Sequence, residues 1–416
     1  MHAEVIAIGS ELLTPFKQDT NSLFLAERLN LIGIHIAFKV VVGDDRSHLT
    51  QVARAAFERS DIIIFMGGLG PTEDDLTREC VADALGLEIH PHPEIIAELY
   101  KWFAARRAPM PKNNERQADV IEGAEVIRNP LGTAPAQWLA TECNGLPRYV
   151  MLLPGPPREL KPLFETEFMP RLRRVLPPAA VARRVLKIAM LGESVADSIA
   201  APIYSQRTDV QTTILASGGE VQLHLLATAA TQEEAQHRVD SLADDLDDAF
   251  GVNVFSTEGE PLEQIVGYHL GMRGLTISVA ESCTGGLVSE RLTNVAGSSQ
   301  WFLGGAVTYS NDLKTKMAMV PAKMIAQHGA VSEQVAQALA AGIRQACGTS
   351  IGLGVTGIAG PGGGTEDKPV GLVYFAIADE RGSEVLERRF PQHDREWIRR
   401  IASQQALDLV RRRILS

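Results

Sequence analysis

The sequence predicts an α/β protein made of three units, and three observations carry this prediction. Short apolar runs alternate with helical patterns up to about residue 172. The same alternation returns from residue 261 onwards. Between these stretches, a linker-type run at residues 176–180 opens a smaller α+β unit. We therefore expect domains at residues 1–172, 173–257 and 258–416.

The first unit follows a strand–helix–strand order. Apolar runs and helical spacing predict strands at residues 5–8, 34–42, 61–66 and 149–153, and helices at residues 23–32, 49–57 and from about 158. Gly33 is placed to end the first helix, because glycine tolerates the left-handed conformation found there. This order favours a parallel sheet with helices on both faces.

The same signals assign elements in the other two units. The middle unit is expected to hold strands at residues 187–191 and 221–227 and helices at 193–204 and 232–250. The third unit is expected to hold helices at 261–272 and 394–414 and strands at 275–280, 304–309, 351–355 and 370–378. The basic run Arg411-Arg412-Arg413 is expected to be a solvated last helical turn, which the helix dipole favours.

Composition excludes several classes of protein. The 416 residues are 45% apolar and 22% charged, as in soluble globular proteins. No stretch reaches the roughly 18 consecutive apolar residues of a spanning helix, and Glu4 stands where a signal peptide carries basic residues. The four cysteines form no disulfide or zinc pattern. A net charge of −11 without a basic stripe argues against nucleic-acid binding. We expect a cytoplasmic protein with no membrane partner.

A glycine-rich turn with two carboxylates follows the expected strand at residues 61–66. Residues 67–77 read GGLGPTEDDLT and precede a helical pattern. Glycines here let backbone N–H groups approach an anion, and a helix N-terminus favours phosphate. Asp74 and Asp75 are placed to hold a divalent cation that bridges a pyrophosphate. The alternative is an ordinary N-cap of acidic residues after a turn.

Together with other polar turns, this motif resembles the N-terminal domain of the CinA family. The matching stretches are GSELL (9–13), DTN (19–21), GGLGPTEDDLT (67–77), NPLGTAP (129–135) and LPGPPREL (153–160). That domain is similar to the molybdopterin-binding fold, and in the family it is associated with metal-dependent ADP-ribose pyrophosphatase activity. One departure is Ala136, where family members commonly have glycine.

This resemblance implies a site that cleaves ADP-ribose to AMP and ribose 5-phosphate. A divalent metal ion (magnesium, manganese or cobalt) would be held by Asp74, Asp75, Glu11 and Glu159, with Asp74 and Asp75 catalytic. The implied substrate-binding residues are Gly67, Gly68, Gly70, Thr72, Asn129 and Thr133.

A second chemical signal is AESCTGG at residues 280–286, again where a strand enters a helix. Ser282 is then exposed at the rim of the sheet, with adjacent backbone N–H groups available for an oxyanion. The alternative is a plain helix N-cap. Cys283 is a competing nucleophile, although no histidine partner is evident and buried thiols are common.

Lys314 closes a polar cluster at residues 304–314, GGAVTYSNDLK. A lysine activates a serine only if burial or nearby cations lower its pKa, so Lys314 would have to face a pocket. A surface lysine is the ordinary alternative. A third glycine-rich loop, residues 356–364, permits close approach of a phosphate or an amide, or forms a flexible connection.

This half resembles the C-terminal domain of the CinA family, a nicotinamide mononucleotide (NMN) deamidase. The matching stretches are AESCTGG, AGSS (296–299), GGAVTYSNDLK, VTGIAGPGGG (355–364) and KPVG (368–371). The resemblance implies Ser282 as nucleophile, Lys314 as base and Tyr309 in proton transfer, without a cofactor. The implied substrate-binding residues are Thr284, Gly285, Gly286, Asn311, Thr356, Gly357, Gly360 and Arg395. His393 stands where the family has glycine in a Gly-Asp-Arg motif.

The middle unit looks like the family's KH-type module, but no GxxG flanked by basic residues occurs in it. We therefore expect a structural role in a homodimer rather than RNA binding. The preferred hypothesis is a two-site enzyme that acts on NMN and ADP-ribose. One alternative is a deamidase whose N-terminal module binds a nucleotide or pterin without hydrolysis. Another is an interaction protein in competence or the DNA-damage response.

Overall fold

The computed structural model describes residues 1–177, 179–391 and 393–416, which fall into two compact units. The first comprises Met1–Val181 with Thr228–Gln232, and the second comprises Ala182–Ala227 with Glu233–Ser416. The α/β fold class is confirmed in both units. Among the described residues, no helix is long and apolar enough to cross a membrane.

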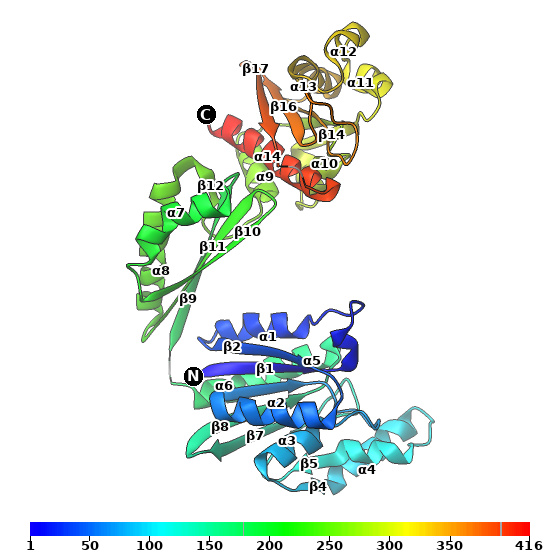
Figure 1. Ribbon diagram of the computed structural model, residues 1–416, viewed down its shortest axis with the longest axis vertical. Helices are drawn as coiled ribbons and strands as arrows, with labels where there is room; N and C mark the ends of the chain where they lie inside the picture. The colour runs from blue at the N-terminus through cyan, green and yellow to red at the C-terminus, as the bar shows by residue number, and fades with distance from the viewer. Residues whose placement is uncertain (178, 392) are drawn as a thin grey trace. The chain divides into compact units, whose positions relative to one another are not determined.

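A six-stranded sheet in the order β2-β1-β3-β8-β7-β6 forms the centre of the first unit (Figure 1). Its strands are β1 (His2–Ile8), β2 (His35–Val42), β3 (Ile62–Met66), β6 (Glu125–Ile127), β7 (Ala136–Cys143) and β8 (Leu146–Leu153). The helices of this unit are α1 (Asn21–Asn30), α2 (Arg46–Arg59), α3 (Thr77–Leu85), α4 (Pro93–Ala105), α5 (Pro157–Leu163) and α6 (Met169–Val175). Two short strands, β4 (Ile89–Pro91) and β5 (Asp119–Ile121), form a separate ribbon.

Helices cover both faces of this sheet, as the sequence predicted. Alternate side chains of β1, β3 and β8 pack against α1, α5 and α6 on one face, where Leu25 and Phe164 are fully buried. The other alternate set packs against α2 and α3, where Phe57 and Val81 are buried. The continuous apolar run of β3 follows from this two-sided burial. The expected role of Gly33 is confirmed, because it takes a φ of 74° after α1.

The parallel arrangement expected for the four predicted strands is confirmed, but two strands that were not predicted join this sheet in antiparallel pairs. β1, β2, β3 and β8 are parallel, whereas β7 runs antiparallel to β8 and β6 antiparallel to β7. The cause is a two-residue hairpin turn at Asn144-Gly145, with φ values of 52° and 76°. Asn-Gly is the favoured pair where both central residues of a tight turn need positive φ. The sheet is therefore mixed.

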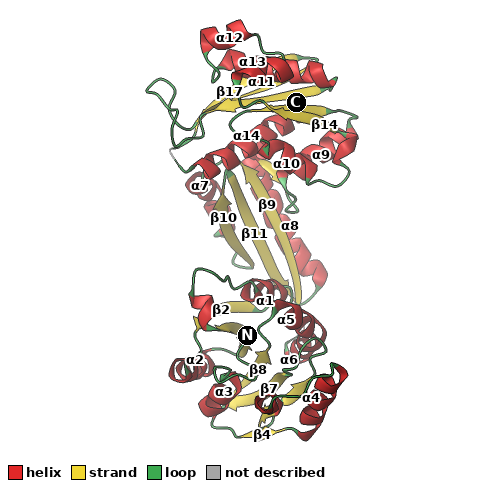
Figure 2. Ribbon diagram, turned by 90° about the vertical axis from the view of Figure 1, so that its right-hand side faces the viewer, coloured by secondary structure: helices red, strands yellow, loops and turns green. Residues whose placement is uncertain are grey.

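The middle part of the chain forms a four-stranded sheet in the order β10-β11-β9-β12. Its elements are β9 (Ala180–Ala189), β10 (Val210–Ser217), β11 (Glu220–Ala229), β12 (Val254–Ser256), α7 (Glu193–Tyr204) and α8 (Gln232–Phe250). Figure 2 shows α8 running alongside this sheet. Alternate residues of β11 are buried, as expected for a sheet with one covered face. The two predicted helices and the strand at 221–227 are confirmed, whereas the strand predicted at 187–191 is only the end of β9, which begins at Ala180; β10 and β12 were not expected.

The C-terminal part contains a five-stranded sheet in the order β14-β13-β15-β16-β17. Its strands are β13 (Ile277–Glu281), β14 (Phe302–Val307), β15 (Ile351–Gly357), β16 (Leu372–Asp379) and β17 (Gly382–Arg389). Helices α9 (Leu262–Met272), α10 (Leu287–Thr293) and α14 (Arg395–Leu415) pack on one face. Helices α11 (Asn311–Ala318), α12 (Ala322–His328) and α13 (Glu333–Cys347) pack on the other. β14, β13 and β15 are parallel, and the last two strands are antiparallel.

The prediction that residues 411–413 form a solvated turn is wrong. Arg411 is buried and pairs with Asp408 at 2.7 Å, while donating to the Val252 carbonyl at 2.6 Å. Arg413 pairs with Asp379 at 2.9 Å, which holds the pKa of that carboxyl well below its usual range. These guanidinium groups are bound to α14 and its neighbours because carboxylates and carbonyls are within their reach.

Candidate functional sites

Ser282 stands where the fully buried strand β13 ends and a tight turn begins. Its backbone N–H donates to the Val355 carbonyl at 2.9 Å, which extends the sheet pairing by one residue. Gly285 and Gly286 follow with φ values of 60° and 95°, conformations that glycine adopts without strain. Ser282 is 8% exposed, so the expectation of an exposed serine is wrong: the residue is buried beneath its neighbours at the sheet edge. The nucleophile expected from the sequence is therefore held on a short, fixed turn at the sheet edge.

Lys314 reaches this serine from α11. The helix begins after Ser310, whose hydroxyl accepts the Leu313 backbone N–H. Lys314 is the fourth residue of this helix and lies on its buried side. Its Nζ lies 3.0 Å from Ser282 Oγ and donates to the Thr308 carbonyl at 2.8 Å. The side chain is 1% exposed, and burial lowers the pKa of the amine. This is the burial that the sequence left open.

Cys283 has a different environment. It is buried, and burial raises the pKa of its thiol to about 12. A thiol is nucleophilic only as its thiolate, and almost none forms near neutral pH at such a pKa. The geometry therefore favours Ser282 over the competing Cys283.

Glu281, which the sequence analysis did not single out, fastens the turn. Its completely buried carboxylate accepts the backbone N–H groups of Gly286, Val288 and Ser289 at 2.9–3.1 Å. It also accepts the Ser289 hydroxyl at 2.7 Å. These donors include orphan amides of the α10 N-terminus, which a carboxylate satisfies well. Its position directly before Ser282 in AESCTGG was the only available signal.

Tyr309 and Arg395 form a second contact beside the serine turn. Arg395 donates to the Tyr309 hydroxyl at 2.7 Å and to the Gly360 carbonyl at 2.8 Å. Tyr309 is 59% exposed, so it lies at the surface of this region. Arg399, one helical turn after Arg395, donates to the Thr284 carbonyl at 2.8 Å. The i, i+4 spacing of these arginines could have identified Arg399 from the sequence.

The remaining predicted residues of this half divide by burial. Thr356 is fully buried and donates to the Ala330 carbonyl at 2.8 Å, and the buried Thr284 hydroxyl has no partner among the described residues. Asn311 is exposed at the start of α11, and Gly357 ends β15. The structure thus brings Lys314 into contact with Ser282, and it brings Arg395 into contact with both Tyr309 and Gly360. The Thr356 hydroxyl is used by a hydrogen bond to the Ala330 carbonyl.

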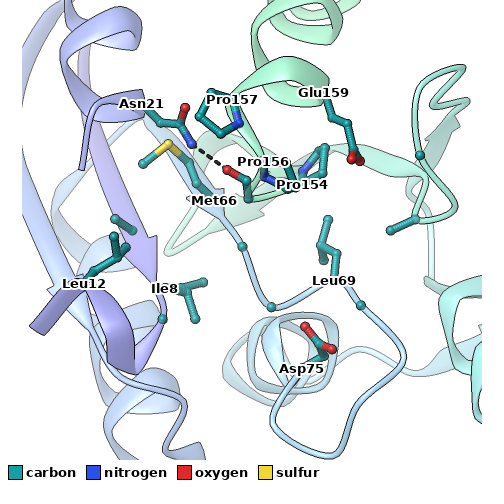
Figure 3. Close-up of a pocket in the computed structure, with 18 of the residues that line it drawn as sticks. Ile8, Leu12, Asn21, Met66, Leu69, Asp75, Pro154, Pro156, Pro157 and Glu159 are labelled. Atoms are coloured by element: carbon teal, nitrogen blue, oxygen red, sulfur yellow. Dashed lines mark hydrogen bonds between the residues drawn. The ribbon is translucent and has the colours of Figure 1, made fainter. Parts of the chain in front are cut away.

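In the first unit, a cavity of about 730 Å³ opens at the edge where β1, β3 and β8 end (Figure 3). Its wall includes the following predicted residues: Glu11, Gly67, Gly68, Gly70, Asp74, Asp75, Thr133 and Glu159. Gly67 and Gly68 have φ values of 100° and 64°, which bring the backbone of this turn close to β1. The ends of parallel strands are where open α/β sheets bind ligands.

Thr72 and Asn129 do not line this cavity; each instead holds a carboxylate that does. The Thr72 amide donates to Asp75 at 2.9 Å, and its hydroxyl contacts the same carboxylate oxygen. Asn129 donates to Glu159 at 2.9 Å and to the Ala134 carbonyl at 3.0 Å. Asp75 lies in a ten-residue loop, because α3 begins only at Thr77. The two aspartates are therefore not N-cap residues of that helix.

The carboxylates are spread over the cavity wall, and Figure 3 draws Asp75 and Glu159 well apart. Among the described residues, no three acidic, histidine or cysteine side chains come close enough to hold a metal ion. The acidic donors nevertheless suit magnesium, which binds through one or two carboxylates when substrate phosphates supply further oxygens. The residues present therefore fit an ion that arrives with a phosphate ligand, not a closed protein cage.

Three further polar residues of this wall were missed as site residues. Lys17 pairs with Glu11 at 2.8 Å, which lowers the pKa of that carboxyl. Asn21 donates to the Gly155 carbonyl at 2.8 Å and so ties α1 to the proline-rich loop. Asp44 accepts the Ser10 amide at 2.7 Å. The DTN motif contained the only signal for Asn21.

Comparison with known proteins assigns each part of the chain. Residues 4–174 match the family described as "Probable molybdopterin binding domain", residues 183–256 the "Damage-inducible protein CinA KH domain", and residues 259–414 the "CinA C-terminal domain". A "CinA-like protein" of Koribacter versatilis is 61% identical over 415 residues, covering all of both chains. One from Acidobacterium capsulatum is 56% identical over the same length. A crystal structure of competence/damage inducible protein CihA from Agrobacterium tumefaciens is 39% identical over 37% of this chain and 94% of its own, with a TM-score of 0.36.

Proposed function

This chain belongs to the CinA family, and from that premise we propose that it is a two-site hydrolase whose C-terminal site deamidates NMN. One observation carries the proposal: a buried lysine amine lies 3.0 Å from the hydroxyl of a serine on a fixed turn. A nucleophile within hydrogen-bond reach of a base whose pKa is lowered is the arrangement that activates serine. No metal or cofactor is needed for this chemistry.

In the first half-reaction, Ser282 Oγ attacks the carboxamide carbon of NMN while its proton passes to the neutral amine of Lys314. The carbonyl electrons form an oxyanion. Lys314 then returns the proton to the amide nitrogen, the carbon–nitrogen bond breaks, and ammonia leaves an ester on Ser282. The Thr308 carbonyl holds the lysine amine in place through both transfers.

The second half-reaction uses water in the same way. Lys314 takes a proton from water, the hydroxide oxygen bonds to the ester carbon, and Ser282 leaves with the returned proton. The product is nicotinate mononucleotide. The oxyanion needs N–H donors, and the amides of Ser282, Gly285 and Gly286 are already engaged. In the described part of the chain, the Cys283 and Thr284 amides have no carbonyl or carboxylate acceptor, so we assign them this role.

Ammonia release from NMN by the purified full-length protein tests this proposal, without added metal and beside a Ser282→Ala variant. We expect release from the wild type and a loss on the order of 10³-fold or more in the variant. A matched control is Ser289→Ala, which removes a nearby hydroxyl on α10 that contacts Glu281 and not the lysine. Full activity in Ser282→Ala would refute the serine mechanism.

For the N-terminal site we propose hydrolysis of ADP-ribose to AMP and ribose 5-phosphate. The supporting observation is a cavity of about 730 Å³ that combines a glycine turn with acidic side chains at one sheet edge. Asp74 and Asp75 would hold a divalent ion together with substrate phosphate oxygens. When bound, such an ion neutralises phosphate charge and favours attack by water.

Release of AMP from ADP-ribose, with and without added magnesium, manganese or cobalt, tests this second activity. Binding is measured in parallel by calorimetry. We expect metal-dependent AMP release. Tight binding of ADP-ribose without AMP release under any metal would instead support a module that binds nucleotides without hydrolysis.

A further inference from the structure

A second polar cavity, of about 410 Å³, lies on the opposite half of α14 from Arg395. Its wall is built from β17 and the C-terminal half of α14, closed by residues from the neighbouring KH-like part. The lining residues are Met190, Asn253, Glu384, Leu386, Arg388, Gln405, Asp408, Leu409, Arg412, Arg413 and Ser416. It contains Arg412 and Arg413 of the basic run, which line neither candidate catalytic site.

Some of the arginine and amide N–H groups of this wall make no hydrogen bond to the described part of the protein. Arg388 uses its Nε for the Gln405 amide oxygen at 3.0 Å and Nη1 for the Glu387 carbonyl. Arg412 uses Nε for Asp408 and Nη2 for Asn253. Among the described residues, Arg388 Nη2 and Arg412 Nη1 have no partner, and neither is a fully buried atom.

Gln405 supplies the third donor. Its side chain is buried, with 3% of the residue exposed, and its oxygen is fixed by Arg388. Its amide nitrogen has no hydrogen-bond partner in the described part of the chain and is not a fully buried atom. Because this nitrogen is not fully buried, its N–H groups are open to the cavity. They are free to donate to a ligand that accepts hydrogen bonds.

The acidic residues of the wall do not cancel these donors. Both oxygens of Asp408 are occupied, one by Arg411 and the other by Arg412. Glu384 lies 3.5 Å from Arg413, which is bound more closely to Asp379. Three donors from two elements suit an anion with several acceptor oxygens, such as a phosphate. Met190, Leu386 and Leu409 supply apolar wall for an attached organic group.

We propose that this cavity, which we call the α14 basic pocket, binds a small phosphomonoester. The one hydroxyl in the described wall, that of Ser416, donates to the Arg413 carbonyl at 3.0 Å, and we propose a binding site and not a third catalytic centre. The same helix carries Arg395 and Arg399, whose contacts reach Gly360 and Thr284. A ligand in the pocket is therefore placed to influence the deamidase turn, a consequence that rests on the proposed function of Ser282.

Calorimetric titration of the full-length protein with inorganic phosphate and with ribose 5-phosphate tests the pocket directly. Arg388→Gln and Gln405→Leu should each weaken one binding event about ten-fold or more, the usual effect of losing a hydrogen bond to a charged group. Arg389→Gln is the matched control, because Arg389 is the next residue on β17, outside this wall, and pairs with Glu387. It should leave all binding events unchanged.

Three results would overturn the proposal. They are identical titrations for wild type and Arg388→Gln, an equal loss in Arg389→Gln, and binding of succinate as tight as that of phosphate. The influence on catalysis is tested separately, as the KM for NMN with and without phosphate. A phosphate effect present in the wild type and absent in Arg388→Gln supports it, and equal effects in both refute it. Failure of the deamidase proposal would leave the titrations interpretable.

Discussion

The two candidate catalytic sites are built in opposite ways. At the C-terminal site the reacting groups contact each other, since Lys314 Nζ lies 3.0 Å from Ser282 Oγ inside the protein. At the N-terminal site the carboxylates contact only their supports: Thr72 holds Asp75 and Lys17 holds Glu11. Burial lowers the pKa of the lysine amine, which is what a base for Ser282 requires. In our proposal the first site needs no group from outside the protein, whereas the dispersed acids of the second need a cation that arrives with phosphate.

The strongest test of this contrast removes the base. Lys314→Met keeps an unbranched side chain in the buried position but no amine, so we expect deamidation to fall on the order of 10³-fold. ADP-ribose cleavage should be unchanged. The control is Lys316→Met, on the same helix but 72% exposed and paired with Asp312. Ammonia release is the measurement, and retention of more than a tenth of the rate in Lys314→Met would contradict the assignment.

The reciprocal change is Asp75→Asn. It removes one charge from the N-terminal cavity while keeping the side-chain volume, so AMP release should fall on the order of 100-fold. Deamidation should not change. Glu73→Gln is a suitable control, because Glu73 is exposed in the same loop and does not line the cavity. If added metal restored full rate to Asp75→Asn, the aspartate would only strengthen metal binding.

The pH dependence of deamidation sharpens the contrast further. Lys314 is a base only when neutral, so kcat/KM should fall as the pH drops below the pKa of its amine, about ten-fold per unit. Because burial lowers that pKa, the inflection should lie below the usual lysine range. An inflection at or above the usual range would show that the amine is solvated in the free enzyme. The N-terminal activity should not share this profile.

The smallest effect concerns the exposed rim. Tyr309→Phe removes the hydroxyl that accepts the Arg395 N–H, a single hydrogen bond at the surface. We expect the KM for NMN to change by about three- to ten-fold, the range for one such bond, with little effect on kcat. Tyr268→Phe, at another exposed tyrosine, should have none. A loss of kcat comparable to that of Lys314→Met would instead place Tyr309 in proton transfer.

The fold could be predicted wherever a local signal decided the outcome. The apolar run of β3, the helix-ending Gly33 and the closing helix α14 were all assigned correctly. The strand β7 was not predicted, because the Asn144-Gly145 turn signal lies between two weakly patterned segments and its meaning depends on both. The burial of Arg411 was missed because its partners at residues 252–254 are distant in sequence.

The candidate sites were predictable as lists of residues but not as contacts. Motifs at strand ends located Ser282, Asp74 and Asp75, since parallel strands bring their ends together. Whether Lys314 was buried depended on the packing of α11 against the sheet, which no local pattern encodes. Thr72 and Asn129, which were predicted to bind substrate, hold carboxylates of the cavity wall, a contact that the sequence did not indicate. Supporting residues of this kind carry the same sequence signal as ligands.

The hairpin at Asn144-Gly145 has one more consequence. Because β7 runs against β8, it begins at the edge where β1, β3 and β8 end. The NPLGTAP loop, which lines the cavity, therefore precedes strand β7. The glycine turn, which lines the same cavity, instead follows strand β3. Insertions that lengthen residues 129–135 would reshape the ligand entrance without altering any strand that carries the glycine turn. The shape of the entrance and the position of the glycine turn can thus change independently of each other.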